Sequence, residues 1–194
     1  MRRVIVSINV TLDGFVSGPK GELDWHFPLW NEEMSGSACE QLQTMDTILM
    51  GRITYQSMSR YWPGAAPTRF GNMMNSFCKV VFSSTLQKTS WNNSRIAAGN
   101  VALEVNRLKK MPGKNMIVYG SISIVDCLKE AGLIDEYRIW VHPVVIGKGK
   151  PLFNLHDHLS LQLLRSKTFG SGVIVLYYQP KNPAFAAVPS PFLA

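Results

Sequence analysis

Residues 48–55 form a segment suited to binding a phosphate group. An apolar run at 48–50 is typical of a buried strand. It is followed by Gly51, Arg52 and Thr54. A glycine lets the backbone approach a ligand closely, an arginine offers paired donors to a phosphate, and a hydroxyl at a helix start lies beside free N–H groups. The alternative interpretation is an ordinary strand, turn and helix with a surface arginine.

A second segment of the same kind spans residues 116–123. Its apolar part ends at Gly120, which frees the backbone at the end of a predicted strand. Ser121 and Ser123 then open a predicted helix with hydroxyl donors. The chain has no G-x-G-x-x-G sequence, so a dinucleotide site here would depend on a single glycine.

Ser83 and Ser84 form a third candidate, because they follow the apolar run 80–82. Their hydroxyls could bind the phosphate of an adenosine, or they could simply cap a turn. If the three segments end neighbouring parallel strands, they meet at one edge of a sheet, where α/β proteins bind ligands.

Cysteine and histidine spacing argues against a metal site or a disulfide framework. The cysteines at 39, 78 and 127 are odd in number and far apart, and no C-x-x-C sequence occurs. His142, His156 and His158 lack ligand spacing with a carboxylate. We therefore expect no metal, and ordinary thiols and histidines.

The composition is that of a globular domain. The chain has 194 residues, of which 46% are apolar and 17% charged, with a net charge of +7. Its basic residues are scattered, so a solvated basic surface is favoured over a nucleic-acid-binding stripe. No apolar run approaches the ~20 residues that span a bilayer, and no cleavable leader follows Met1. We expect a cytoplasmic protein that binds neither nucleic acid nor membrane.

Hydrophobic periodicity predicts strands that alternate with helices after a long loop at 11–28. This order favours an α/β fold with a mostly parallel, twisted sheet, helices on both faces, and a C-terminal antiparallel hairpin. The predicted strands are 3–10, 47–50, 79–82, 115–119 and 136–146, the helices 31–45, 54–60, 101–111 and 121–131, and the hairpin 159–169 with 173–179.

The chain resembles the dihydrofolate reductase superfamily in four segments that occur in the right order. They are Thr11 to Val16, Met50 to Tyr55, Tyr119 to Ser121, and Gly132 to Tyr137. A fifth segment, 142–153, narrows the resemblance to the reductase domain of the bifunctional riboflavin-biosynthesis deaminase–reductase. The similarity covers residues 2–179 and implies a three-layer reductase domain at 1–179, with a proline-rich tail or docking arm at 180–194.

The resemblance implies NADPH as the hydride donor. It places the pyrophosphate and the 2′-phosphate near Gly51, Arg52 and Thr54, and the nicotinamide near the first strand and the long loop. The complete cofactor set that it implies is Asn9, Val10, Val16, Gly51, Arg52, Thr54, Ser83, Ser84, Gly120, Ser121, Ile122 and Ser123.

On the substrate side, the resemblance matches Trp25 and Pro28 to the mobile loop over the nicotinamide. Folate-reducing members carry an acid shortly after these residues, but this chain has Trp30 there. The proton donors left are Asp24, the two glutamates that follow Trp30, and water, and Asp24 is our candidate catalytic residue. We therefore expect dihydrofolate to be a poor substrate.

The function predicted from the sequence is an NADPH-dependent reductase acting on a small heterocycle, either a riboflavin-precursor pyrimidine or a pterin. The alternative is a nucleotide-binding protein of the same fold that has lost catalysis. The family pairs through edge strands, so a homodimer is expected. Apolar residues in 180–194 favour packing of this tail on its own domain or on a partner subunit, with a frayed terminus as the alternative.

Overall fold

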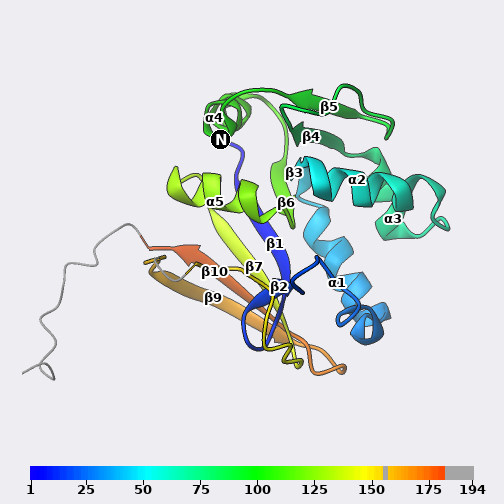
Figure 1. The fold of residues 1–194 in the computed structure, drawn as a ribbon, viewed down its shortest axis with the longest axis vertical. Helices are drawn as coiled ribbons and strands as arrows, with labels where there is room; N and C mark the ends of the chain where they lie inside the picture. Colours follow the sequence, from blue (N-terminus) through cyan, green and yellow to red (C-terminus); the bar gives the residue numbers. More distant parts are fainter. Residues whose placement is uncertain (155–156, 182–194) are drawn as a thin grey trace, which may run out of the picture.

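The strands predicted from the sequence meet in a single mixed sheet (Figure 1). The structure is a computed structural model that describes residues 1–154 and 157–181. The sheet has eight strands in the order β5-β4-β3-β6-β1-β7-β10-β9, and a separate two-stranded sheet pairs β2 with β8. The strands are β1 Val4–Thr11, β2 Phe15–Ser17, β3 Met45–Gly51, β4 Cys78–Phe82, β5 Ser94–Ala97, β6 Asn115–Tyr119, β7 Glu136–His142, β8 Lys150–Pro151, β9 Leu161–Thr168 and β10 Ile174–Pro180.

The strands from β5 to β7 run parallel, and β10 and β9 add an antiparallel hairpin at one edge. β1 lies between β6 and β7, with Asn9 opposite Trp140 and Thr11 opposite His142. Because parallel strands end at the same edge, the carboxyl ends of β1, β3, β4, β6 and β7 lie together. The predicted α/β fold with a mostly parallel sheet and a terminal hairpin is confirmed.

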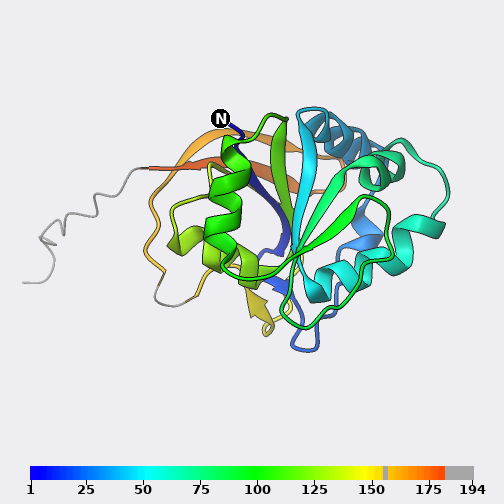
Figure 2. The ribbon, with the colours of Figure 1, turned by 90° about the horizontal axis from the view of Figure 1, so that it is seen from above.

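Helices cover both faces of the sheet (Figure 2). Side chains of α4 and α5 pack on one face, and those of α1 and α3 pack on the other. The helices are α1 Glu32–Leu42, α2 Arg52–Tyr61, α3 Arg69–Ser76, α4 Val101–Lys110 and α5 Ile122–Glu130, with short 3-10 turns at Phe27–Leu29 and Trp62–Gly64.

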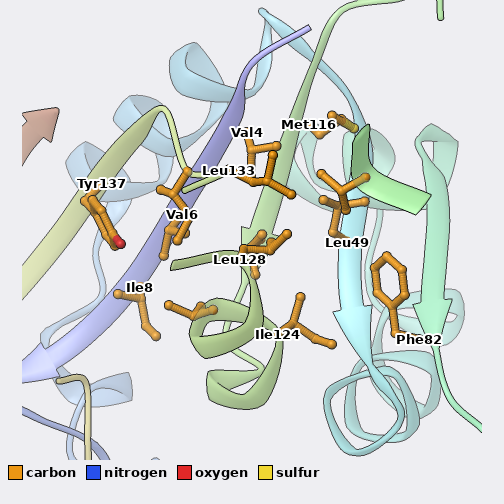
Figure 3. Packing of buried hydrophobic residues seen from close by; sticks show 14 of the residues in the cluster. Val4, Val6, Ile8, Leu49, Phe82, Met116, Ile124, Leu128, Leu133 and Tyr137 are labelled. Carbon is orange, nitrogen blue, oxygen red and sulfur yellow. The ribbon is translucent and has the colours of Figure 1, made fainter. Parts of the chain in front are cut away.

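Alternation along β1 divides its side chains between the two faces. Val4, Val6 and Ile8 enter the main core together with residues of α5 such as Leu128 (Figure 3). Ile5 packs on the opposite face. Since side chains along a strand alternate with a period of two, Ser7 and Asn9 share the face of Ile5. This is also the face covered by α1 and α3.

Two predicted boundaries are wrong. The helix expected at 31–45 ends at Leu42, and Met45 already begins β3. The strand expected at 136–146 ends at His142, because Pro143 has no N–H group to continue a ladder.

The predicted long loop is also only partly a loop. It contains β2, which pairs with β8 at Lys150–Pro151, a strand that the sequence did not predict. The prediction missed α3 and β5 as well. β10 extends to Pro180, and most of the expected tail, residues 182–194, lies outside the described residues. Among the described residues, no helix is long and apolar enough to cross a membrane.

Candidate active site

The ends of β3 and β6 bring together the two segments predicted to bind phosphate. The backbone N–H of Gly51 donates a 2.8 Å hydrogen bond to Ser121 Oγ. Ser121 Oγ in turn donates a 2.6 Å hydrogen bond to Thr54 Oγ1. These residues and Gly120 form what we call the glycine–serine cradle, which joins the starts of α2 and α5.

Both helices that begin at the cradle have free N-termini. In the described part of the chain, no side chain caps α2 at Gly51 or α5 at Ser121. The other α-helices are capped, by Asn31, Thr68 and Asn100. Uncapped N–H groups and the helix dipole favour a bound anion. Two such ends on neighbouring strands therefore suit a pyrophosphate.

The backbone of the cradle is unusual as well. Gly120 and Ser121 are both left-handed, with φ of 61° and 62°. Glycine adopts this conformation freely, but serine is strained there, at a cost of about 1 kcal/mol or more. Such strain persists where surrounding contacts hold it, often at functional sites. Here the two hydrogen bonds of the Ser121 hydroxyl hold the turn.

The remaining cofactor candidates lie near the cradle or at the next strand. Arg52 is exposed on the first turn of α2, and its Nη1 donates to Gln56 Oε1 at 3.1 Å. Ser83 follows β4, which neighbours β3, and its Oγ accepts from the N–H groups of Thr85 and Leu86. The predicted turn-capping role of Ser83 is thus present, while Ser84 is exposed.

The first turn of α5 completes the set near the cradle. Ser123 is exposed there, and Ile122 packs against the main core, so Ile122 offers a ligand mainly its backbone. The same holds for Val10 and Val16, whose side chains are buried in the main core. These residues can line a cofactor only through backbone atoms.

Aromatic rings gather on the α1 and α3 face, beside the cradle. The ring centroid of Trp30 lies 5.8 Å from the ring centroid of Trp140 and 6.4 Å from that of Phe70. Phe70 lies 5.4 Å from Trp62 and 6.4 Å from Tyr119 of β6. We call these five residues the aromatic cluster. Flat, apolar rings of this kind suit a flat heterocycle.

The aromatic cluster itself contains no acidic side chain. Trp30, at the position where the resemblance implies an acid in folate-reducing members, is 36% exposed. Glu32 and Glu33 lie in the first turn of α1, as expected for residues that complement the helix dipole. Glu33 Oε2 also accepts a 3.1 Å hydrogen bond from the Gly170 N–H. Asp24 is exposed, so the structure does not enclose it as a catalytic acid.

A polar cluster that the sequence did not reveal lies at the ends of β1 and β7. His142 is fully buried, and its Nε2 lies 3.1 Å from Asn9 Oδ1. The ring of His142 is 5.1 Å from Trp25 and 5.9 Å from His26. Burial, with a smaller effect of His26, lowers the pKa of His142 to about 4, so this ring is neutral near pH 7. The residues are 133 positions apart in the chain, which hides the pair from sequence patterns.

Of the predicted substrate residues, Trp25 joins this polar cluster and Trp30 joins the aromatic cluster. Pro28 is exposed in the 3-10 turn between them. Within residues 1–154 and 157–181, no group of three His, Cys, Asp or Glu side chains is placed to hold a metal ion. An open surface hollow lies at the opposite edge of the sheet, but its Arg2 and Lys109 already pair with Asp46 and Asp135.

Comparison with known proteins agrees with this architecture. The sequence profile of the RibD C-terminal domain matches residues 2–175. The uncharacterized protein YyaP of Bacillus subtilis strain 168 is 36% identical over 182 residues, which cover 91% of this chain and 94% of YyaP.

Two solved structures share the fold. A pyrimidine reductase-like protein of Corynebacterium diphtheriae is 13% identical with a TM-score of 0.67, covering 94% of this chain and 93% of its own. Dihydrofolate reductase of Enterococcus faecalis, complexed with NADP(H), is 12% identical with a TM-score of 0.64, covering 93% of this chain and 97% of its own. With the profile match over most of its length, the chain belongs to the RibD C-terminal domain family.

Proposed function

We propose that the protein is an NADPH-dependent reductase that transfers hydride to a small, flat heterocycle. The observation that carries this proposal is the glycine–serine cradle, where two uncapped helices start beside the aromatic cluster. An anion site next to a partly buried cluster of aromatic rings fits a dinucleotide and a ring substrate. The reductases among its structural neighbours support the same reaction class.

The residues present fit the cofactor. The free N–H groups at the starts of α2 and α5 would hold the pyrophosphate, with Thr54 and Ser121 fixing the cradle. Arg52, with Ser83 and Ser84 on the neighbouring strand end, would contact the 2′-phosphate that distinguishes NADPH from NADH. When bound, NADPH supplies the hydride.

For the substrate, we propose a riboflavin-precursor pyrimidine or a related ring, bound by the aromatic cluster. A pterin is a weaker candidate, because Trp30 replaces the acid that folate-reducing members use. Reduction of a C=N or C=O bond also needs a proton. With Asp24 exposed, we propose that water supplies it, directly or through Asp24.

The second candidate function is nucleotide binding without catalysis. It is favoured by one observation, that the aromatic cluster contains no acid and the candidate Asp24 is exposed. Binding of NADPH without oxidation by any heterocycle would support it.

The deciding experiment is a reductase screen. NADPH oxidation is followed with dihydrofolate, with other pterins and with 5-amino-6-(5-phosphoribosylamino)uracil, the substrate for which a structural neighbour from Thermotoga maritima is named. We expect turnover of the pyrimidine and little turnover of dihydrofolate. Failure to bind NADPH by a folded protein would refute the proposal.

We also propose that the protein acts as a cytoplasmic homodimer. The hairpin strand β9 lies at an edge of the sheet and exposes Leu163 and Leu164, which are 50% and 47% exposed. Static light scattering behind a size-exclusion column tests the dimer, and a monomer at all concentrations would exclude it.

A further inference from the structure

Two buried polar atoms at the ends of β1 and β7 have no partner in the described chain. They are Nδ1 of His142 and Nε1 of Trp25. Leaving such an atom unpaired costs about 1–3 kcal/mol, so native proteins pair nearly all of them. Their rings are 5.1 Å apart and meet edge to face at 81°. The two atoms therefore belong to one place in the fold.

The hydrogen-bonding role of each atom follows from its surroundings. Asn9 Oδ1 can only accept, so the Nε2 of His142 that faces it carries the proton. In a neutral imidazole, the other nitrogen is then a bare acceptor. The indole Nε1 of Trp25 can only donate. The cluster thus presents one acceptor beside one donor.

His26 does not change this pattern. Its Nδ1 lies 2.6 Å from the backbone oxygen of Leu23 and therefore donates to it. Burial lowers the pKa of His26, and any charge on His26 lowers the pKa of His142 further, so His26 does not favour protonation of His142. A carboxylate or phosphate would find no proton on Nδ1 of His142 to bond. An amide edge, with its N–H beside its C=O, complements both atoms.

The place of this pair also suits a ligand held at the cradle. The sheet order runs β3, β6, β1, β7, so the cradle between β3 and β6 lies two strand spacings from the pair between β1 and β7. That distance is roughly 10 Å, which a ribose and an attached ring span together. Trp25 lies outside the strands and α-helices, so a ring bound beside it would leave the pairing of the sheet intact.

We propose that His142 and Trp25 recognise an amide edge, with His142 Nδ1 accepting its N–H and Trp25 Nε1 donating to its C=O. This inference rests on the proposed function, because the amide is either the carboxamide of the nicotinamide or the ring amide of a pyrimidine substrate. The two sources share one chemistry and are separated by the test below.

The test compares ligands that have the N–H group with analogues in which methyl groups replace it. For the cofactor, NADPH is compared with its 3-acetylpyridine analogue, which keeps the carbonyl and lacks the N–H. For the substrate, uracil is compared with 1,3-dimethyluracil in the same way. Dissociation constants are measured by calorimetry for the wild type and for His142→Gln and Trp25→Phe. His26→Gln is the matched control, since its ring already bonds Leu23.

Glutamine places its amide where Nε2 was, so His142→Gln keeps a partner for Asn9 and loses the acceptor at Nδ1. We expect the wild type to prefer the N–H ligand of one pair by about 3- to 10-fold, the worth of one hydrogen bond. His142→Gln should erase this preference. Trp25→Phe should weaken both members of the pair equally, and His26→Gln should leave the ratio unchanged.

A preference in the cofactor pair assigns the site to the carboxamide, and a preference in the uracil pair assigns it to the substrate. If His142→Gln changes neither ratio, the proposal is wrong. A variant that changes only the thermal stability also refutes the proposal, because it would mean that a water molecule bonds Nδ1 of His142 and Nε1 of Trp25. His142→Asn, which retains a polar group near Nδ1, covers the case where the glutamine variant does not fold. Failure of wild type to bind NADPH would instead count against the proposed function.

Discussion

Ser121 is the residue whose replacement tests the cradle most sharply. Its hydroxyl accepts from the buried Gly51 N–H at 2.8 Å and donates to Thr54 at 2.6 Å, while its own backbone is left-handed. Ser121→Ala removes both hydrogen bonds and keeps the strain. Leaving the Gly51 N–H unpaired costs about 1–3 kcal/mol. For a chain of this size, we expect the melting temperature to fall by about 2–4 °C for each kcal/mol.

Ser121→Gly loses the same hydrogen bonds but relieves the left-handed backbone, by about 1 kcal/mol. We therefore expect the glycine variant to be more stable than the alanine variant, although at most positions alanine gives a more stable protein than glycine. Both variants should bind NADPH more weakly than the wild type. Urea unfolding monitored by circular dichroism measures the ranking.

The reasoning fails if Ser121→Ala is as stable as the wild type, since the hydroxyl would then hold nothing. It also fails if alanine is more stable than glycine, because the φ of 62° would then carry no strain. A control replacement at the exposed Ser123, on the same helix, should change stability by less than about 0.5 kcal/mol.

Three further predictions follow from charge and protonation. Arg52→Ala should weaken NADPH binding by about 10- to 150-fold and NADH binding little, because a charge-assisted hydrogen bond is worth about 1.5–3 kcal/mol; equal losses would move Arg52 to the pyrophosphate. Dihydrofolate should be a poor substrate, and robust turnover that survives Asp24→Asn would contradict both the substrate and the proton source. His142 stays neutral in the fold down to about pH 4 but protonates near 6.5 when unfolded. The free energy of unfolding should therefore fall by about 1–3 kcal/mol as the pH drops from about 6.5 to about 4. Unfolding curves measured at several pH values should show this fall in the wild type and not in His142→Gln.

Sequence patterns predicted the central sheet because its strands are short apolar runs that end in glycine, serine or proline. They missed α3 because it is only eight residues long and has a glycine inside. They missed β5 because Ser94–Ala97 is a four-residue edge strand with an exposed arginine, stabilised by pairing with β4 rather than by its own composition. The local sequence was enough to predict whether most segments are helix or strand, but it did not show which strands pair with each other.

The same distinction applies to the site. Gly51, Thr54, Gly120 and Ser121 could be predicted together, because parallel strands bring their carboxyl ends to one edge. His142 could not, because its partner Asn9 lies on another strand and its burial depends on the Trp25 segment. Val10 and Val16 were predicted to line the nicotinamide, but the alternation of their strands turns their side chains into the core, which leaves only their backbone atoms for that role.

The central claim is that the cradle binds a dinucleotide phosphate. Calorimetric titration of the wild type and of Gly120→Val with NADPH tests it most directly, with circular dichroism as the check on folding. Gly120 has a φ of 61°, a conformation that a β-branched residue resists. We predict one saturable site in the wild type and a large loss of affinity in the folded variant. No binding to the folded wild type, or equal binding by both proteins, would contradict the account.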